Sequence, residues 1–250
     1  MRRVLRWLLR LILACAVLTV LCALGLAYLH GRGLILESGE SDPEEWEVFG
    51  VDVSTYQGAV DWPVLVRQGV DFAFIKATEG SSLRDVRFAE NWAGALEAGV
   101  RPGAYHFFSY DSPGERQAEN FIATVPRTEG ALPPVVDVEF YGDYLEQPAP
   151  RETARAILDP LLERLEDYYG VKPILYCTYR AYRLYLSGGA YADYPLWISS
   201  PRVAPLLHDW TFWQYSHTAR LEGYDGHQDK IDLNVFRGTR EEFEAFGLPG

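Results

Sequence analysis

The sequence predicts an α/β fold, a small and distorted TIM-type barrel of eight mainly parallel strands with helices mostly after the first five, preceded by an N-terminal transmembrane helix. Short apolar stretches rich in β-branched and aromatic residues alternate with amphipathic stretches, which indicates parallel strands joined by helical crossovers. Eight strand candidates within roughly 200 residues fit a barrel near its lower size limit. No glycine-rich phosphate loop follows the first strand candidate, so an open doubly wound sheet is the less favoured alternative.

The first thirty residues predict a membrane anchor. The run from Leu11 to Leu29 contains no charged residue and follows four arginines. As a helix with a rise of about 1.5 Å per residue, this run covers roughly 29 Å, close to the hydrocarbon thickness of a bilayer. The arginines place the N-terminus in the cytoplasm. We therefore expect a single-pass cell-membrane protein with an extracytoplasmic body; cleavage as a signal peptide, which leads to secretion, is the alternative.

Three regions follow from these patterns: a basic stub with the anchor over 1–30, a linker rich in Gly, Glu and Asp over 31–48, and a folded domain over 49–250. Strands are expected at 49–54, 72–77, 102–107, 134–138, 173–177, 195–199, 211–215 and 231–235. Amphipathic helices are expected at 62–68, 86–98, 113–124 and 151–169. The last three strands are separated by loops too short or too polar for full helices.

The charge balance and the cysteine count exclude several classes of partner. Asp and Glu outnumber Lys and Arg by 35 to 23, a net charge of -12, which disfavours nucleic acid held through its phosphates. The three cysteines, Cys15, Cys22 and Cys177, cannot build a disulfide framework or a four-thiolate zinc site. The histidines lack the helical spacing of a zinc motif. We therefore expect no metal and no cofactor.

Acidic side chains gather where a barrel of this kind carries its chemistry, at the C-terminal ends of the strands. Asp52 falls near the end of the first strand, Asp137 and Glu139 end the fourth, and Asp232 begins the last. The first and last strands of a closed barrel are neighbours, so these four acids are expected to line one cleft. Two alternatives remain: the acids pair with Lys76, arginines or backbone groups for stability, or they bind a hard cation.

Asp137 and Glu139 are two residues apart, so on a strand both side chains point to one face. Like charges at this range, next to apolar residues, raise at least one pKa, and a carboxylic acid that stays protonated near neutral pH is what a glycosidase uses to protonate its leaving oxygen. Glu139 is the expected acid because its side chain reaches farther.

Further candidates for substrate contact lie at or beside strand ends. Lys76 and Glu79 are expected to form an ion pair at the same mouth, and His106 is as compatible with a buried core histidine as with a substrate contact. Aromatic residues near strand ends include core residues and one or two expected sugar platforms. The full set of substrate-binding candidates is Lys76, Glu79, Tyr105, His106, Tyr176, Trp197, Trp213 and Gln214.

Eight segments together resemble one known enzyme family: VDVSTYQG (51–58), FIKATEG (74–80), GAYHFF (103–108), PPVVDVE (133–139), PILYC (173–177), PLWIS (195–199), FWQYS (212–216) and KIDLNVF (230–236). From about Phe49 to Gly238 the chain is similar to the glycoside hydrolase family 25 lysozymes, the Chalaropsis-type N-acetylmuramidases. The resemblance covers nearly the whole expected domain, and no single motif carries it alone.

The resemblance implies an acidic groove on a distorted barrel that cleaves the β-1,4 bond between N-acetylmuramic acid and N-acetylglucosamine in peptidoglycan glycan strands. It implies Glu139 as general acid, with Asp137, Asp52 and Asp232 completing the catalytic cluster. Two mechanisms stay open: water attack with inversion, or attack by the substrate's 2-acetamido oxygen oriented by Asp137, which we favour. The alternative function is a catalytically inactive peptidoglycan-binding module of the same fold. We expect a monomer that meets the membrane only through its N-terminal helix.

Overall fold

The computed structural model describes residues 2–31, 46–201, 204–205 and 209–249. The chain divides into two compact units, Met1–Ser38 and Gly39–Gly250, and each is considered by itself. Most of the linker expected over 31–48 lies outside the described residues. The folded domain expected over 49–250 falls within the second unit.

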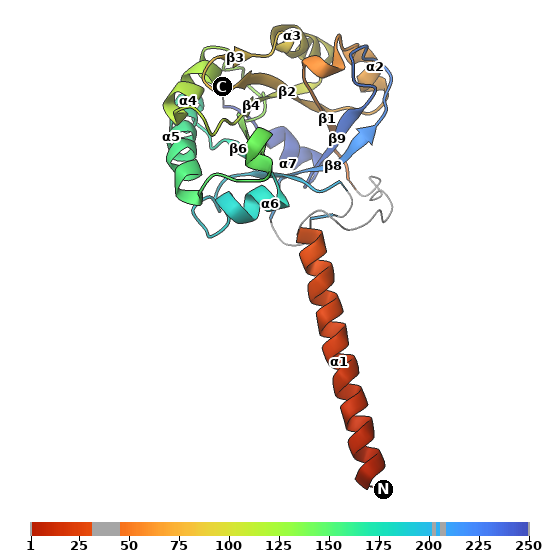
Figure 1. Cartoon of the computed structure of the whole chain (residues 1–250). Helices are drawn as coiled ribbons and strands as arrows, with labels where there is room; N and C mark the ends of the chain where they lie inside the picture. The colour runs from red at the N-terminus through yellow and green to blue at the C-terminus, as the bar shows by residue number, and fades with distance from the viewer. Residues whose placement is uncertain (1, 32–45, 202–203, 206–208, 250) are drawn as a thin grey trace. The chain divides into compact units, whose positions relative to one another are not determined.

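The described residues of the first unit form the helix α1 (Arg2–Gly31) (Figure 1). Its helical character agrees with the expectation for the apolar run. Within the part of the chain that the structure describes, no helix is long and apolar enough to cross a membrane. The anchoring role expected for residues 11–29 stays a prediction.

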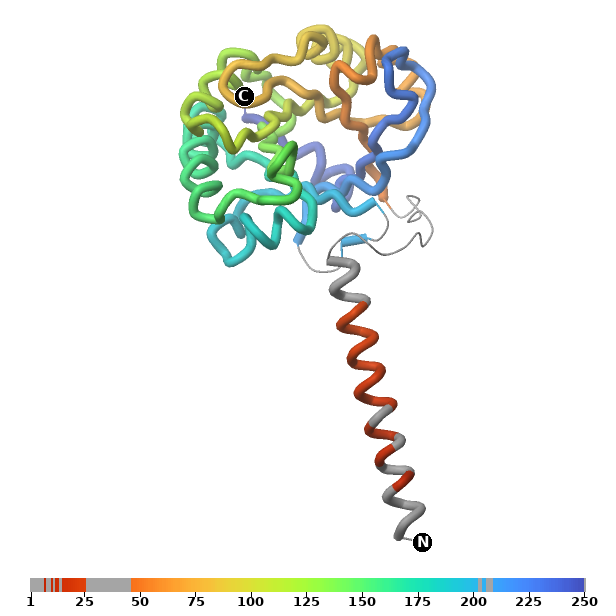
Figure 2. The backbone as a smooth tube through the Cα atoms, viewed as in Figure 1, coloured from red at the N-terminus to blue at the C-terminus, as the bar shows by residue number. Residues whose placement is uncertain are grey.

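The second unit is built on a closed barrel of eight strands, with a ninth short strand outside it. The sheet order is β1-β9-β8-β7-β6-β5-β4-β2-β3, and β1 also pairs with β2, which closes the ring. Figure 2 shows the orange segment of β1 beside the blue segment of β9, where the two ends of the strand series meet. The barrel strands are β1 (Phe49–Val53), β2 (Phe72–Glu79), β4 (Arg101–Phe107), β5 (Val135–Val138), β6 (Ile174–Thr178), β7 (Leu196–Ser199), β8 (Phe212–Ala219) and β9 (Ile231–Phe236). The extra strand β3 (Leu83–Arg84) forms a short antiparallel pair with β2.

All neighbouring barrel strands are parallel except the pairs that involve β9, which is antiparallel to both β1 and β8. The connection from β8 to β9, residues 220–230, contains no helix. A parallel return requires a long crossover, whereas a hairpin connection produces antiparallel strands. The last strand therefore starts at the end of the barrel where the parallel strands finish. We call this end the mouth and the opposite end the floor.

Helices follow the first five barrel strands; those after the first four lie where the sequence predicts them, and no range was predicted for the short one after β6. They are α2 (Trp62–Arg67), α3 (Phe88–Ala98), α4 (Gly114–Ile122), α5 (Arg151–Tyr169) and α6 (Tyr179–Ala181), which continues into a π-helical turn over Tyr182–Leu186. Figure 1 shows α2 to α5 around the outside of the strands. Asp61 begins α2 by accepting a hydrogen bond from the backbone of Val64, and Gly99 ends α3 with φ at +80°, a left-handed conformation that glycine adopts without cost.

Several short elements were not predicted from the sequence: the strand β3, the 3₁₀ turns Thr55–Gln57 and Gly142–Leu145, and the helix α7 (Arg240–Ala245). α7 begins with a capping box, in which Thr239 and Glu242 each bond the other's backbone N–H. Phe243 of α7 and Phe246 behind it join the apolar cluster inside the barrel. α7 therefore closes the floor.

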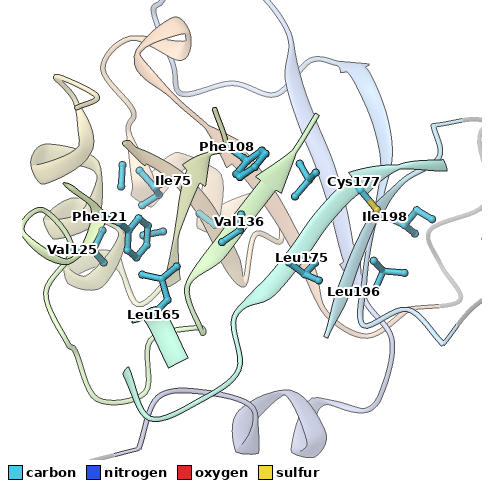
Figure 3. Close-up of a cluster of buried hydrophobic side chains, with 14 of the residues drawn as sticks. Ile75, Phe108, Phe121, Val125, Val136, Leu165, Leu175, Cys177, Leu196 and Ile198 are labelled. Atoms are coloured by element: carbon cyan, nitrogen blue, oxygen red, sulfur yellow. The ribbon is translucent and has the colours of Figure 1, made fainter. Parts of the chain in front are cut away.

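Two apolar cores result from the alternation of side chains along each strand. The outer core lies between the strands and the helices; Figure 3 shows Val136, Leu175 and Ile198 from neighbouring strands together with Phe121 and Leu165 from the helical layer. The inner core fills the barrel near the floor with Val48, Phe72, Phe74, Leu132, Val135, Ile174, Tyr176, Trp197, Phe212, Phe236 and Phe243. The polar inner positions therefore lie nearer the mouth.

Candidate active site

The inner faces of the strands carry polar residues two positions beyond the apolar inner core. Asp52 is in register with Phe74 of β2, and Asp137 is two residues beyond Val135 of β5. Gln214 follows Phe212 at the same spacing on β8. Because side chains two apart on a strand share a face, these polar groups stand directly above the apolar core. The structure thus brings the predicted acids to one end of one barrel.

Asp52 and Asp232 are direct partners in the antiparallel pairing of β1 with β9. The reversed direction of β9 brings Asp232 to the mouth, because a parallel last strand would begin at the floor and place Asp232 there. The side-chain amide of Gln214 lies between the two acids: its Nε2 donates to Oδ2 of Asp52 at 2.9 Å and to Oδ2 of Asp232 at 3.1 Å. One amide therefore joins the two carboxyl groups.

Glu139 is connected to the same amide through a tyrosine. The hydroxyl of Tyr176 lies 3.3 Å from Oε1 of Glu139 and 2.9 Å from Oε1 of Gln214. Ser199 Oγ donates to that same Gln214 oxygen at 2.8 Å. Three of the four acids thus belong to one hydrogen-bonded network centred on Gln214, which is only 4% exposed.

Two members of this network, Asn234 and Ser199, were not among the predicted site residues. Asn234 Nδ2 donates to Oδ2 of Asp52 at 2.9 Å, and its Oδ1 accepts from Trp197 Nε1 at 2.9 Å. Asn234 is two residues after Asp232 on the same strand, so the spacing that pairs Asp137 with Glu139 could have identified it.

Burial raises the pKa of each acid in the cluster. It brings the pKa of Asp52 to about 6, against the opposing effect of hydrogen bonds from Asn234 and Gln214. It brings the pKa of Asp232 to about 8, with the charges of Asp52 and Glu139 adding to the effect. The two opposed carboxyl groups therefore differ in their affinity for a proton.

The pKa of Glu139 is raised to about 7, chiefly by burial, while the hydrogen bond from Tyr176 lowers it and the charge of Asp52 raises it. Asp137 has a pKa raised well above its ordinary value, first by burial and next by the charge of Glu139, with Lys76 acting in the opposite direction. Asp137 is 6% exposed, and its Oδ1 has no hydrogen-bond partner among the described residues. This oxygen is a buried acceptor available to a ligand.

Lys76 and Glu79 form the ion pair that the sequence predicts, with Nζ and Oε2 2.7 Å apart. The ammonium also lies 4.9 Å from the ring centre of Phe107, which is in register with Asp137 on the next strand. Tyr105 lies on the inner face, and burial followed by the charges of Asp52 and Asp137 raises its pKa well above the ordinary value. These three predicted residues therefore share the mouth with the acids.

The structure does not bring His106 and Trp213 to the acid cluster. His106 is fully buried on the outer face of β4, where Thr78 and Gln117 bond its two ring nitrogens at 2.7 and 2.9 Å, and burial lowers its pKa to about 4. Trp213 is also turned outward, packing on Trp210 and donating to the carbonyl of Ser200. Both follow an inner-facing residue by one position, so the pleat points them away from the barrel interior. The substrate contacts expected for these two are corrected accordingly.

Trp197 and Tyr176 are inner-facing but largely occupied by the protein. Trp197 is 2% exposed and stacks on Phe74 with ring centres 4.2 Å apart, so it belongs to the inner core. Tyr176 packs on Trp197 and points its hydroxyl at Glu139 and Gln214. Neither offers an open aromatic face of the kind expected for a sugar platform. Within the described ranges, no group of three or more His, Cys, Asp or Glu side chains is placed to hold a metal ion.

The sequence model described as Glycosyl hydrolases family 25 matches residues 51–224, which contain Asp52, Asp137 and Glu139. The chain belongs to glycosyl hydrolase family 25. A family 25 glycosyl hydrolase from Bacillus anthracis has a solved structure that is 48% identical, with a TM-score of 0.78, covering 85% of this chain and 98% of that one. Family 25 membership makes this protein a glycoside hydrolase, built on the eight-stranded barrel described above.

Two curated relatives are similar to this chain. Lysozyme M1 of Streptomyces globisporus is 33% identical over 215 residues, covering 77% of this chain and 68% of its own length. The protein YegX of Escherichia coli K12, described as uncharacterized, is 35% identical over 212 residues, covering 82% of this chain and 75% of its own length. The similarity to these two relatives thus extends over most of the barrel unit.

Proposed function

We propose that this family 25 glycosyl hydrolase is a muramidase that cleaves the β-1,4 bond between N-acetylmuramic acid and N-acetylglucosamine in peptidoglycan, with Glu139 as its general acid. The similarity to Lysozyme M1 supports the substrate class. The observation that carries the role of Glu139 is its place: a half-buried carboxyl group at the mouth, next but one to Asp137 on the chain and 3.3 Å from the hydroxyl of Tyr176. Burial raises its pKa to about 7, which agrees with this role. Such a group is protonated in a large fraction of molecules near neutral pH and can donate to a leaving oxygen.

The neighbouring Asp137 fits the role of a group that orients the substrate's 2-acetamido arm. Its Oδ1 is a buried acceptor without a partner among the described residues, and an acetamido N–H is a donor that such an acceptor binds. With the N–H held by Asp137, the acetamido oxygen attacks C1 from the face opposite the leaving group. Glu139 protonates the leaving oxygen in the same step, which breaks the glycosidic bond and leaves a cyclic oxazolinium ion. Water then adds to C1 from the face that the leaving group vacated, its proton returns to Glu139, and the configuration is retained.

The test uses full-length protein and purified peptidoglycan. Glu139→Gln removes the proton donor and leaves the side chain nearly unchanged in shape, so release of reducing ends is expected to fall by at least ~10²-fold. Glu163→Gln, which alters an exposed carboxylate on α5, serves as the matched control and keeps full activity. Mass spectrometry of the muropeptides identifies the bond that is cut. Near-normal activity of Glu139→Gln, or N-acetylglucosaminidase products from the wild type, would overturn the proposal.

The stereochemistry of the product tests the acetamido route separately. Proton NMR of the first-formed reducing end distinguishes retention from inversion. Retention supports attack by the acetamido oxygen, whereas inversion supports a carboxylate-activated water. A wild-type protein that binds peptidoglycan without releasing reducing ends would instead support the inactive binding module.

We also propose that residues 11–29 anchor the enzyme in the cell membrane with the barrel outside the cytoplasm. The uncharged run and the four preceding arginines support this, and α1 is helical over Arg2–Gly31. Replacing Leu18 and Leu21 by arginine adds roughly 3 kcal/mol per residue to the cost of insertion. The wild type is expected in alkali-washed membranes and the double variant outside them. Recovery of the intact wild type in the soluble fraction contradicts the anchor, and loss of the first residues indicates cleavage and secretion.

We propose that the enzyme acts as a monomer, because the acid cluster is complete within one chain. Light scattering of the full-length protein in detergent, corrected for the micelle, gives the protein mass directly. A dimer mass contradicts this proposal.

A further inference from the structure

Asp52 and Asp232 receive unequal numbers of hydrogen bonds from side-chain amides. Oδ2 of Asp52 accepts from Gln214 Nε2 and from Asn234 Nδ2, each at 2.9 Å. Among the residues that the structure describes, Oδ2 of Asp232 accepts from Gln214 alone, at 3.1 Å. An amide donor stabilises a carboxylate more than a neutral carboxylic acid, so the additional donor favours negative charge on Asp52.

The bonding capacity of Gln214 is used up within the protein. A glutamine side chain has two N–H donors and one oxygen with two lone pairs. Both donors go to the two aspartates, and the oxygen lies within bonding distance of Tyr176 and Ser199. This residue therefore acts through its neighbours and does not contact a sugar, which revises the substrate-binding role that its place in the sequence indicates.

Asn234 is held equally firmly and is completely buried. Its oxygen accepts from the indole of Trp197, which fixes the amide so that its nitrogen faces Asp52. Asn234 and Gln214 are in register on β9 and β8, so the two amides approach Asp52 from adjacent strands. The asymmetry between the two aspartates is thus built into the barrel wall.

Other ionisable groups face this pair from the remaining strands. Glu139 acts on both aspartates, Asp52 also interacts with Asp137, and Lys76 acts on Asp137. Two tyrosines face Asp52 from β4 and β6, with their own pKa values raised first by burial. The surrounding negative groups make it unfavourable for Asp52 and Asp232 to be charged at the same time. The two amides determine which of the two aspartates carries the single charge. These groups are Lys76, Glu79, Tyr105, Asp137, Glu139 and Tyr176.

We propose that Gln214 and Asn234 are positioning residues that assign opposite protonation states to the two facing acids, so that Asp52 holds the negative charge and Asp232 holds a proton when the glycan binds. The pKa values of about 6 for Asp52 and about 8 for Asp232, both raised first by burial, agree with this order. The meaning for catalysis rests on the proposed muramidase function: a single fixed charge stabilises the positive charge that develops at C1, and the neutral partner avoids repulsion.

The experiment is a titration of the carboxyl carbons by ¹³C NMR in the full-length protein in detergent, without substrate. Asp52→Asn and Asp232→Asn assign the two signals by their loss. In the wild type, Asp52 is expected to titrate about two units below Asp232. Asn234→Leu removes the donor that only Asp52 receives, so the midpoint of Asp52 is expected to rise by about one unit while that of Asp232 moves little.

Two further variants complete the test. Gln147→Leu is the matched control, because it removes an exposed side-chain amide that bonds neither aspartate. Its two midpoints are expected to stay near those of the wild type. Gln214→Met removes one donor from each aspartate and is expected to raise both midpoints with their order preserved. If Asn234→Leu does not fold, the rise of the Asp52 midpoint in Gln214→Met decides the test instead.

The titration needs no turnover, so its result is independent of whether the wild type cleaves peptidoglycan. The proposed difference in protonation between Asp52 and Asp232 would be overturned by any of three results. These are equal midpoints in the wild type, a lower midpoint for Asp232 than for Asp52, or an unchanged midpoint of Asp52 in both amide variants. In an active enzyme, the acid limb of the pH profile of kcat/KM is expected to lie at higher pH for Asn234→Leu than for the wild type. The KM of this variant is expected to stay within about threefold of the wild-type value. A raised KM with an unmoved profile would point to a sugar contact instead.

Discussion

Asp52 and Asp232 face each other across the antiparallel pairing of β1 and β9, and the amide nitrogen of Gln214 donates to both, at 2.9 and 3.1 Å. Two carboxyl groups joined in this way titrate as a pair, since the charge of one raises the pKa of the other. The same pairing places them on the mouth that also carries Asp137 and Glu139. The chemistry of the mouth therefore depends on which of four acids are charged at a given pH.

The first prediction concerns the pH dependence of activity. Glu139 must carry a proton, and its pKa of about 7, raised chiefly by burial, means that kcat/KM falls as the pH rises above about 7. Asp52 must be charged, and its pKa of about 6, also raised by burial, means that activity falls below about 6. A narrow bell-shaped profile with its maximum between these values is expected in initial-rate assays on soluble glycan fragments. Constant activity from pH 7 to 9 contradicts the assignment of Glu139.

The second prediction concerns Asp137. Asp137→Asn retains the size of the side chain but replaces one carboxyl oxygen with an NH₂ group, which cannot accept from the acetamido N–H and so weakens the hold on it. We expect kcat to fall on the order of 10²-fold with KM changed little, because the interaction strengthens in the transition state. Initial rates on chitin-like and muropeptide oligomers measure this. Asp143→Asn, in the exposed turn after β5, is the control and should behave as the wild type.

The third prediction links the acid cluster to stability. Asp232 has a folded-state pKa of about 8, raised first by burial, against 3.8 in an unperturbed side chain. The folded state therefore binds this proton more tightly than the unfolded state, and the stabilisation is lost as the pH rises from about 4 to about 8. Asp232→Asn is neutral in both states, so its thermal midpoint should decline less than that of the wild type over this interval.

Thermal denaturation followed by circular dichroism at pH 4, 6 and 8 measures this difference. Asp167→Asn, which changes an exposed carboxylate on α5, should follow the wild type at all three values. A steeper decline in Asp232→Asn than in the wild type is the contrary outcome. It would mean that burial of the charged form is less costly than the surroundings of Asp232 indicate.

The fourth prediction concerns the floor of the barrel. Phe243 of α7 is 4% exposed and packs against Phe72 and Phe236 in the inner core. Phe243→Ala removes these contacts and leaves a cavity, which typically costs about 3–5 kcal/mol of unfolding free energy. Urea denaturation measures the loss. Phe246→Ala, at a partly buried neighbour, should cost less, and an equal or greater loss there would argue that α7 does not close the core in this way.

The alternation of apolar and amphipathic segments was sufficient to predict the eight barrel strands and the main helices, because both patterns reflect burial on fixed periods. The direction of β9 was not predicted: apolar alternation is the same for either direction, and only the lack of a crossover in 220–230 indicates it. Short elements such as α7 were missed because six residues give too little periodicity to recognise.

For the site, the period of two placed Asp137 and Glu139 on one face, and the same rule applied to β4 and β8 separates His106 and Trp213 from it. The amide network could not be predicted by this rule. Asn234 and Ser199 are ordinary polar residues in sequence, and their importance comes from contacts between strands that are adjacent only in the folded barrel. Such contacts require the register of pairing, which no local pattern contains.

The barrel has both its chain entrance and its closing helix at the floor. Val48 leads into β1 within the inner core, and α7 is tied there through Arg240, which bonds the backbone oxygen of Glu47 and the carboxylate of Asp71. A reporter, an affinity handle or a solid support fused beyond α7 would therefore be joined to the face opposite Asp52 and Asp232. Immobilisation through that end should leave the carboxylates open to insoluble wall fragments, a practical advantage for a hydrolase whose substrate does not diffuse.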